Sequence, residues 1–127
     1  MYYINRILEA DFDDAIARVT TALSKEGFGV LTEIDVQATL RKKLDVDFRR
    51  YRILGACNPP FAHKALQAED KIGLMLPCNV IVQEREDGGV EVAAIDPAAA
   101  MQGVGNPALE PIASEVREKL QRVISGL

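Results

Sequence analysis

The two cysteines of this 127-residue chain are each followed by asparagine, as Cys57-Asn58 and Cys78-Asn79. The segment between them has the composition of a short helix and opens with Pro59-Pro60. Asparagine is a preferred N-cap residue, and proline suits the first helical position because its missing N–H costs nothing there. A helix beginning at this point would direct its positive end toward Cys57, where a thiolate is stabilised if the group is not buried. This pattern predicts a candidate binding or thiol site made of Cys57, Asn58, Cys78 and Asn79.

The same four residues have a second interpretation, in which they only pack and cap. Free cysteine is among the most frequently buried residue types, Asn58 has a capping role, and Asn79 can bond backbone groups near a strand start. The separation of the two sulfurs depends on topology. Parallel strands would place Cys57 and Cys78 at opposite edges, about 20 Å apart, whereas antiparallel strands would let them approach. Both alternatives remain open at this stage.

His63 is the one histidine of the chain and completes the set of candidate site residues. It lies two positions after Phe61, about 200° around a helix, which predicts an exposed side chain turned away from the core. A Cys57–His63 nucleophile pair would require this ring to turn back over the start of its own helix. Structural zinc takes four ligands, and two cysteines with one histidine fall short of that number. The sequence therefore predicts no metal and no cofactor.

Charge and composition narrow the choice of partner. The net charge is −4, and the basic residues Arg41–Lys43 and Arg49–Arg52 are interrupted by Asp45 and Asp47. We interpret them as a solvated face, and expect no nucleic-acid partner because phosphate binding relies on clustered Lys and Arg. No apolar stretch approaches the ~18 residues of a membrane span, and the N-terminus lacks the features of a signal peptide. We expect no membrane association, a cytoplasmic location and two reduced thiols.

Hydrophobic periodicity and turn residues predict nine elements in the order β-α-β-α-β-α-β-β-α. Strands are expected over residues 2–8, 28–35, 49–56, 78–86 and 90–95, and helices over 12–26, 36–44, the segment between the cysteines, and 112–127. Three strand–helix–strand units indicate parallel crossovers, and Asp87-Gly88-Gly89 indicates an antiparallel hairpin. The prediction is an α/β fold, with an α+β arrangement left open: one mixed five-stranded sheet with helices mainly on one face.

Several strands are apolar in both phases, as in Ile53-Leu54 and Val80-Ile81-Val82. This pattern indicates that both faces of the sheet are covered. A chain of this length supplies too few helices for two faces, so we expect self-association across the uncovered face.

The chain resembles the domain-of-unknown-function family 302 (DUF302), a set of small bacterial and archaeal proteins. The residues that carry the resemblance are Tyr51–Pro60, Ala65-Leu66 and Ile72–Val80, with weaker agreement at Glu33–Val36 and Asp96-Pro97. The resemblance implies a compact single domain over residues 1–127, an α/β sandwich-like architecture and a dimer. It implies no established activity.

Taken together, the sequence favours a non-enzymatic ligand-binding or assembly module. Its expected partners are a second copy of the chain, in a homodimer, and a small-molecule ligand. The candidate site lies near the start of the helix that follows Cys57. The alternative is a thiol-based redox or metal-linked activity that uses Cys57 and Cys78, so the sequence leaves the question of enzymatic activity open.

Overall fold

The computed structural model describes all 127 residues and contains the nine expected elements. The strands are β1 (Tyr3–Leu8), β2 (Gly29–Asp35), β3 (Tyr51–Cys57), β4 (Cys78–Glu84) and β5 (Val90–Ile95). The main helices are α1 (Phe12–Lys25), α2 (Val36–Leu44), α3 (Pro59–Ala68) and α5 (Glu110–Ser125). A short helix, α4 (Pro97–Met101), and the 3-10 turns η1 (Asp70–Met75), η2 (Gln102–Val104) and η3 (Pro107–Leu109) were not predicted.

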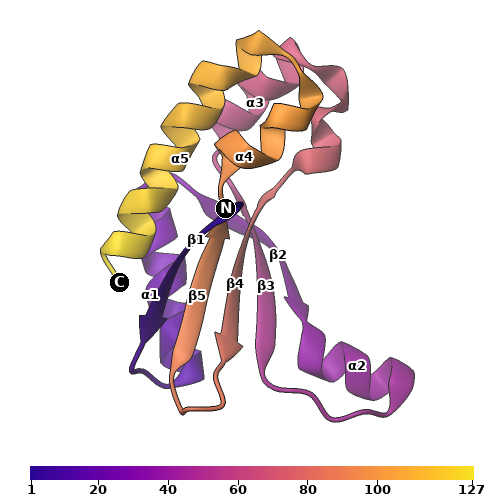
Figure 1. Cartoon of the computed structure of the whole chain (residues 1–127), viewed down its shortest axis with the longest axis vertical. Coiled ribbons are helices and arrows are strands. Elements are labelled where there is room, and N and C mark those ends of the chain that lie inside the picture. The colour runs from indigo at the N-terminus through magenta and orange to yellow at the C-terminus, as the bar shows by residue number, and fades with distance from the viewer.

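The five strands form one sheet in the order β1-β5-β4-β3-β2, and every neighbouring pair is antiparallel. The predicted single sheet, its five strands and the element order are confirmed, and the α+β arrangement is the one adopted. The predicted mixed sheet with parallel crossovers is wrong. The prediction failed at α2 and α3, which sit at opposite ends of the sheet (Figure 1). Each of these helices begins and finishes at the same end of the sheet, so the strands before and after it run antiparallel. Only α1 carries the chain back along the sheet, and it joins the two edge strands, which never pair.

The hydrophobic core lies between one face of the sheet and helices α1 and α5 (Figure 1). The predicted helix over 12–26 contributes apolar residues of α1 spaced three and four apart, of which Phe12, Ala15, Val19 and Leu23 are buried. α1 ends within one residue of the predicted position 26, and Gly27 follows in the left-handed region at a φ of 86°. The sheet contributes the alternate residues that point toward the helices: Leu54, Val80, Val82, Val92 and Ala94. A smaller cluster of Ala65, Ile72 and Leu109 joins α3 to the turns beyond the sheet end.

The opposite face of the sheet is not covered by any helix. One row across it, set by the strand register, runs through Ile34, Ile53, Ile81, Ala93 and Asn5. Ile34 is 48% exposed, and Ile53 and Ile81 are half-buried. We call this surface the open face. The chain itself therefore covers one face of the sheet only.

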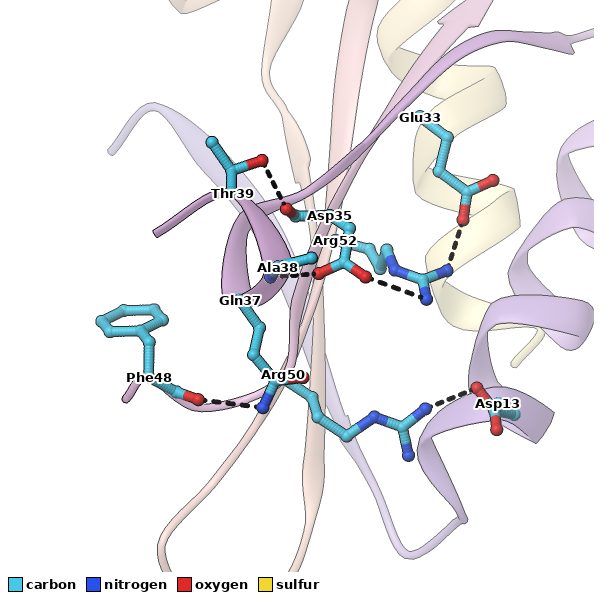
Figure 2. Close-up of polar contacts among 9 residues, drawn as sticks. All are labelled: Asp13, Glu33, Asp35, Gln37, Ala38, Thr39, Phe48, Arg50 and Arg52. Carbon is cyan, nitrogen blue, oxygen red and sulfur yellow. Dashed lines mark hydrogen bonds and ion pairs between the residues drawn. The ribbon is translucent and has the colours of Figure 1, made fainter. Parts of the chain in front are cut away.

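The segment around α2 projects from the sheet as an arm in which no helical residue is buried (Figure 1). The carboxylate of Asp35 caps α2 by accepting from the Ala38 N–H at 2.9 Å, and Gln37 donates to the Phe48 carbonyl at 3.0 Å (Figure 2). Arg52 pairs with Glu33 and Asp35.

Arg50, beside the arm, ties β3 to the start of α1. Its guanidinium lies 2.6 Å from an Asp13 carboxylate oxygen (Figure 2) and 4.4 Å from the centre of the Phe12 ring.

None of the helices has both the length and the apolar composition that crossing a membrane requires.

Candidate functional site

A small pocket lies where β3 ends and β4 begins, enclosed by α3, α4 and α5. Its cavity measures about 30 Å³. Of the 15 residues that line it, 12 are hydrophobic, and the only polar side chain other than the thiols is that of Asn58. The pocket contains no carboxylate and no imidazole, so its chemistry is that of its sulfur atoms and one amide.

The structure brings the two cysteines together at this pocket. Ala56 is directly opposite Cys78 in the antiparallel register, so Cys57 is the next residue along the neighbouring strand. Both cysteines line the same cavity, and neither is in a disulfide. The separation of about 20 Å that parallel strands would impose is therefore excluded. Antiparallel pairing places the last residue of β3 and the first residue of β4 at the same end of the sheet.

The two thiols differ in their surroundings. Cys57 is half-buried, whereas Cys78 is buried at 8% exposure. The pKa of the Cys78 thiol is raised from its ordinary value of 9.0 to about 11, mainly by burial and to a smaller extent by the neighbouring Cys57. An apolar environment disfavours the charged thiolate, which explains the direction of this shift. Cys78 is thus a neutral thiol near pH 7, and Cys57 is the more accessible of the two.

Asn58 occupies the predicted N-cap position of α3, but its side chain makes no capping hydrogen bond. An N-cap side chain accepts from the second or third helical N–H, and Pro60 at the second position has none. The Asn58 amide instead donates to the Glu26 carbonyl at 3.1 Å, which links the start of α3 to the end of α1. Asn58 is buried at 7% exposure, so this bond fixes one wall of the pocket.

The other two candidate residues lie elsewhere. His63 is exposed on α3, as its helical position predicted, and does not line the pocket. Asn79 follows Cys78 on β4 and is exposed on the open face, because successive strand residues point to opposite faces. There it borders a shallow concavity of about 420 Å³ with the three tyrosines Tyr2, Tyr3 and Tyr51. The paired Cys-Asn motif therefore contributes three residues to one pocket and the fourth to another surface.

Helix α4 is the part of the pocket that sequence reasoning missed. The strand over 90–95 and the helix over 112–127 were predicted with no element between them, although an aspartate before a proline, as in Asp96-Pro97, favours a helix start. The Asp96 carboxylate caps α4 by accepting from the Ala98 N–H at 3.0 Å, and Arg117 of α5 donates to it at 3.0 Å. Pro97 and Met101 at the two ends of α4 line the cavity. The signal for this wall was present in Asp96-Pro97 and the alanines that follow.

No group of three or more His, Cys, Asp or Glu side chains is arranged to hold a metal ion. What the pocket offers a ligand is a tight apolar surface, two thiols on adjacent strands, and the nearby N-terminus of the ten-residue helix α3.

Comparison with known proteins relates this architecture to others. An uncharacterised protein of Aquifex aeolicus (strain VF5) is 28% identical over 116 residues, which is 91% of this chain and 74% of that protein. The crystal structure of an uncharacterised conserved DUF302 protein from Bacillus stearothermophilus superposes with a TM-score of 0.91 at 28% identity. The superposition covers 98% of this chain and 97% of that one. The family model described as "Domain of unknown function DUF302" matches residues 4–127, and this chain belongs to that family.

Proposed function

We propose that this domain is a non-enzymatic binding module that works as a homodimer, with its ligand site in the pocket beside Cys57. The observation that carries the proposal is the pocket itself, an apolar cavity placed where five segments meet and lined by both halves of the Cys57-Asn58 pair. Ligand sites in proteins are concave and mainly apolar, with few polar groups that fix orientation. The thiols and the Asn58 amide supply such groups here.

The volume of the cavity limits what it can admit. A cavity of about 30 Å³ is several times smaller than an apolar cavity that admits benzene, which measures roughly 150 Å³. An organic ligand of ordinary size would have to displace α4, the shortest helix of the wall. We therefore expect a compact ligand that is one atom or one small group wide.

Xenon tests whether the pocket admits a compact apolar guest. We expect amide shifts in NMR spectra of the pressurised protein to centre on Ala56, Cys57 and Ala113. Ala113→Val adds two methyl groups inside the lining and should abolish these shifts, whereas Ala22→Val on α1, outside the lining, should preserve them. Absence of xenon shifts in the unmodified protein, or shifts that survive Ala113→Val, would contradict the proposal.

The homodimer part of the proposal is supported by the open face. Five strands about 4.8 Å apart and about 20 Å long present a face of roughly 500 Å² in projection, and the side chains that stand on it bring its accessible area toward the roughly 800 Å² that each partner buries in a standard interface. Ile53 and Ile81 are paired on its two inner strands, and Tyr2, Tyr3 and Tyr51 border the concavity on it. A second copy presents the same surface, so a two-fold contact would bury both apolar faces at once.

Sedimentation at micromolar concentration checks the assembly. We expect about twice the chain mass of 13.9 kDa for the unmodified protein. Ile81→Lys in the middle of the open face should give the monomer mass. Leu66→Lys replaces an apolar residue that is 44% exposed on α3, away from this face, and should leave the dimer intact. A monomeric unmodified protein would refute the assembly.

The alternative, a thiol-based activity, is favoured by one observation: both cysteines are among the residues that line the pocket. Titration of the native protein with a thiol reagent across pH distinguishes the thiol-based activity from the non-enzymatic binding module. A thiol that reacts near neutral pH supports chemistry at Cys57, and two inert thiols leave only the binding module.

We also infer a cytoplasmic location with both thiols reduced, and a partner other than nucleic acid because the chain carries a net charge of −4.

A further inference from the structure

We propose that the arm around α2 clasps the second copy of the chain in the homodimer, with the tip of α2 seated on the β1 edge of the partner's sheet. This inference rests on the homodimer proposed above. It names the two surfaces that meet in that dimer and the direction of its two-fold axis. It also gives a role to Lys42 and Lys43, which were interpreted from the sequence as part of a solvated face.

The arm presents apolar side chains that nothing in its own chain covers. Val36, Leu40 and Leu44 follow one another at spacings of four along α2, which places them on one side of the helix. None of them is buried, and Leu44 at the helix end is 65% exposed. Isolated helices shorter than about 12–15 residues are marginal in water, and α2 has nine residues. A partner that covers this side of α2 would therefore stabilise it.

The last turn of α2 places positive charge beside Leu44. Arg41, Lys42 and Lys43 all lie in this turn. Arg41 pairs with two aspartates that follow the helix, whereas Lys42 and Lys43 are exposed and form no ion pair within the chain. The tip of α2 thus offers an apolar side chain with two free ammonium groups next to it. Its complement is an apolar surface bordered by carboxylates.

A surface of this kind lies at the end of β1. It is a concavity of about 610 Å³ whose lining includes Ile7 and the carboxylates of Glu9, Asp11 and Asp87, with no basic residue. Ile7 is 50% exposed on the open face, so the concavity continues the surface proposed as the dimer interface. Glu9 and Asp11 are exposed and form no ion pair within the chain. We call this surface the acidic concavity.

The strand register places the arm and the acidic concavity at the same end of the sheet but at opposite edges. The row that starts at the residue before α2 runs through Asp35, Arg52, Val82, Val92 and Arg6. Four inter-strand spacings, roughly 19 Å, separate β2 from β1. The arm also points away from the sheet (Figure 1). The tip of α2 therefore cannot reach the acidic concavity of its own chain.

A two-fold axis parallel to the strands, between two open faces, brings these surfaces together in a dimer. Rotation about this axis places the β2 edge of one copy over the β1 edge of the other and keeps their β4–β5 hairpins at the same end. Each arm then meets the partner's acidic concavity, so the contact forms twice, as two-fold symmetry requires. An axis across the strands would instead bring the arm to the α3 end of the partner, which lacks the acidic concavity (Figure 1).

Exchange of charge between the two surfaces tests the clasp. Lys42→Glu/Lys43→Glu makes the arm acidic, and Glu9→Lys/Asp11→Lys makes the concavity basic. Each variant alone places like charges against each other, so the Kd of its homodimer in sedimentation should rise about 10-fold or more. An equimolar mixture has opposite charges at both contacts. The heterodimer should therefore reach about nine-tenths of all dimers in native mass spectrometry, against about half for random pairing.

The control for charge is Lys64→Glu/Lys71→Glu, which reverses two exposed lysines on α3 and η1 at the other end of the sheet. Its homodimer should keep the unmodified Kd. Mixed with Glu9→Lys/Asp11→Lys, it should give no excess of heterodimer, because one contact is restored and the other is not.

Leu44→Asp tests the apolar part of the clasp. Burial of a largely exposed leucine corresponds to about 10-fold in affinity for each contact, and the dimer has two, so its Kd should rise on the order of 100-fold. Leu74→Asp is the matched control, because Leu74 is 86% exposed on η1, away from the arm. It should leave the Kd unchanged.

The outcomes separate the clasp from the homodimer on which it rests. A monomeric unmodified protein would overturn both. If the unmodified protein is a dimer that Ile81→Lys dissociates, but the charge variants pair at random or Leu44→Asp keeps the unmodified Kd, the clasp is wrong and the open-face dimer stands. Far-UV circular dichroism detects loss of fold in each variant. Two charge variants that fail to pair even when mixed would also overturn the clasp.

Discussion

The two faces of the sheet carry similar residues in different surroundings. On the covered face, Val80, Val82 and Val92 are fully buried beneath α1 and α5. On the open face, Ile34 and Ile7 are about half exposed, at 48% and 50%. Apolar surface left in water forgoes about 25 cal/mol for each Å² that burial would remove. The comparison shows that residue type alone does not decide burial, because the chain has helices for only one face.

Neighbouring residues of β3 give the largest test of this comparison. Leu54 is 1% exposed on the covered face, and Ile53 is half-buried on the open face. Leu54→Ala should lower the free energy of unfolding by about 2–5 kcal/mol because it leaves a cavity in the core. Ile53→Ala should cost less than about 1.5 kcal/mol in the monomer. Urea unfolding at submicromolar protein concentration measures both.

Equal losses for the two variants would mean that the open face is covered even at this dilution. A loss for Ile53→Ala that grows with protein concentration would instead sharpen the comparison, since only association can bury that side chain further.

The pH dependence of stability distinguishes Cys78 on the covered face from the exposed residues of the open face. The folded state holds the Cys78 proton up to a pKa of about 11, and the unfolded chain releases it near 9.0. The contribution of the neutral Cys78 thiol to the free energy of unfolding is therefore complete below pH 9 and is lost as pH rises from 9 to 11. A difference of about 2 between the folded and unfolded pKa corresponds to roughly 2–3 kcal/mol of unfolding free energy.

Cys78→Ala removes this titration, so its unfolding free energy should fall less than that of the unmodified protein between pH 8 and pH 10.5. Parallel pH profiles for the two proteins would show that the Cys78 thiol is not held neutral by the fold.

Elements with a strong local signal were predictable from the sequence. The stripe of Phe12, Ala15, Val19 and Leu23, with Gly27 after it, defines α1 through spacing and backbone freedom alone. Strand pairing was not predictable in the same way. A helix between two strands signals a crossover only if it returns along the sheet, and α3 lies beyond the sheet end instead. That choice depends on tertiary packing of Ala65 with Ile72 and Leu109, which no local pattern encodes.

The candidate site was located by Cys57-Asn58, but its composition depended on the topology. Antiparallel pairing added Cys78 and placed Asn79 on the other face, a consequence of the two-residue period of a strand. Met101, 44 residues beyond Cys57 in the sequence, lines the pocket through α4, a helix that was not predicted. Whether a small ligand occupies the pocket stays a prediction.

Gly55 tests how tightly the open face is packed near the pocket. A Cβ at this position would overlap the Thr32 hydroxyl and come within 2.7 Å of Pro77 Cγ. Gly55→Ala should therefore cost about 1–3 kcal/mol through overpacking. Gly29→Ala, on the edge strand with nothing within 4 Å of the new methyl group, should be neutral or slightly stabilising. Thermal unfolding of the two variants measures the difference, and equal midpoints would show that Thr32 and Pro77 move aside at no cost.

A polar row on the open face gives the smallest expected effect. The Glu91 carboxylate accepts from Asn5 at 2.9 Å and from Gln83 at 2.8 Å, and Arg49 donates to Gln83 at 2.9 Å. Hydrogen bonds reached by water contribute little, so Glu91→Ala should lower the unfolding free energy of the monomer by less than about 1 kcal/mol. Glu86→Ala, at an exposed residue that makes no side-chain hydrogen bond, should change it by no more than about 0.5 kcal/mol. Urea unfolding at submicromolar concentration compares them. A loss of about 2 kcal/mol or more for Glu91→Ala in the monomer is the size expected for a desolvated network, and it would place this row of the open face among the buried parts of the molecule.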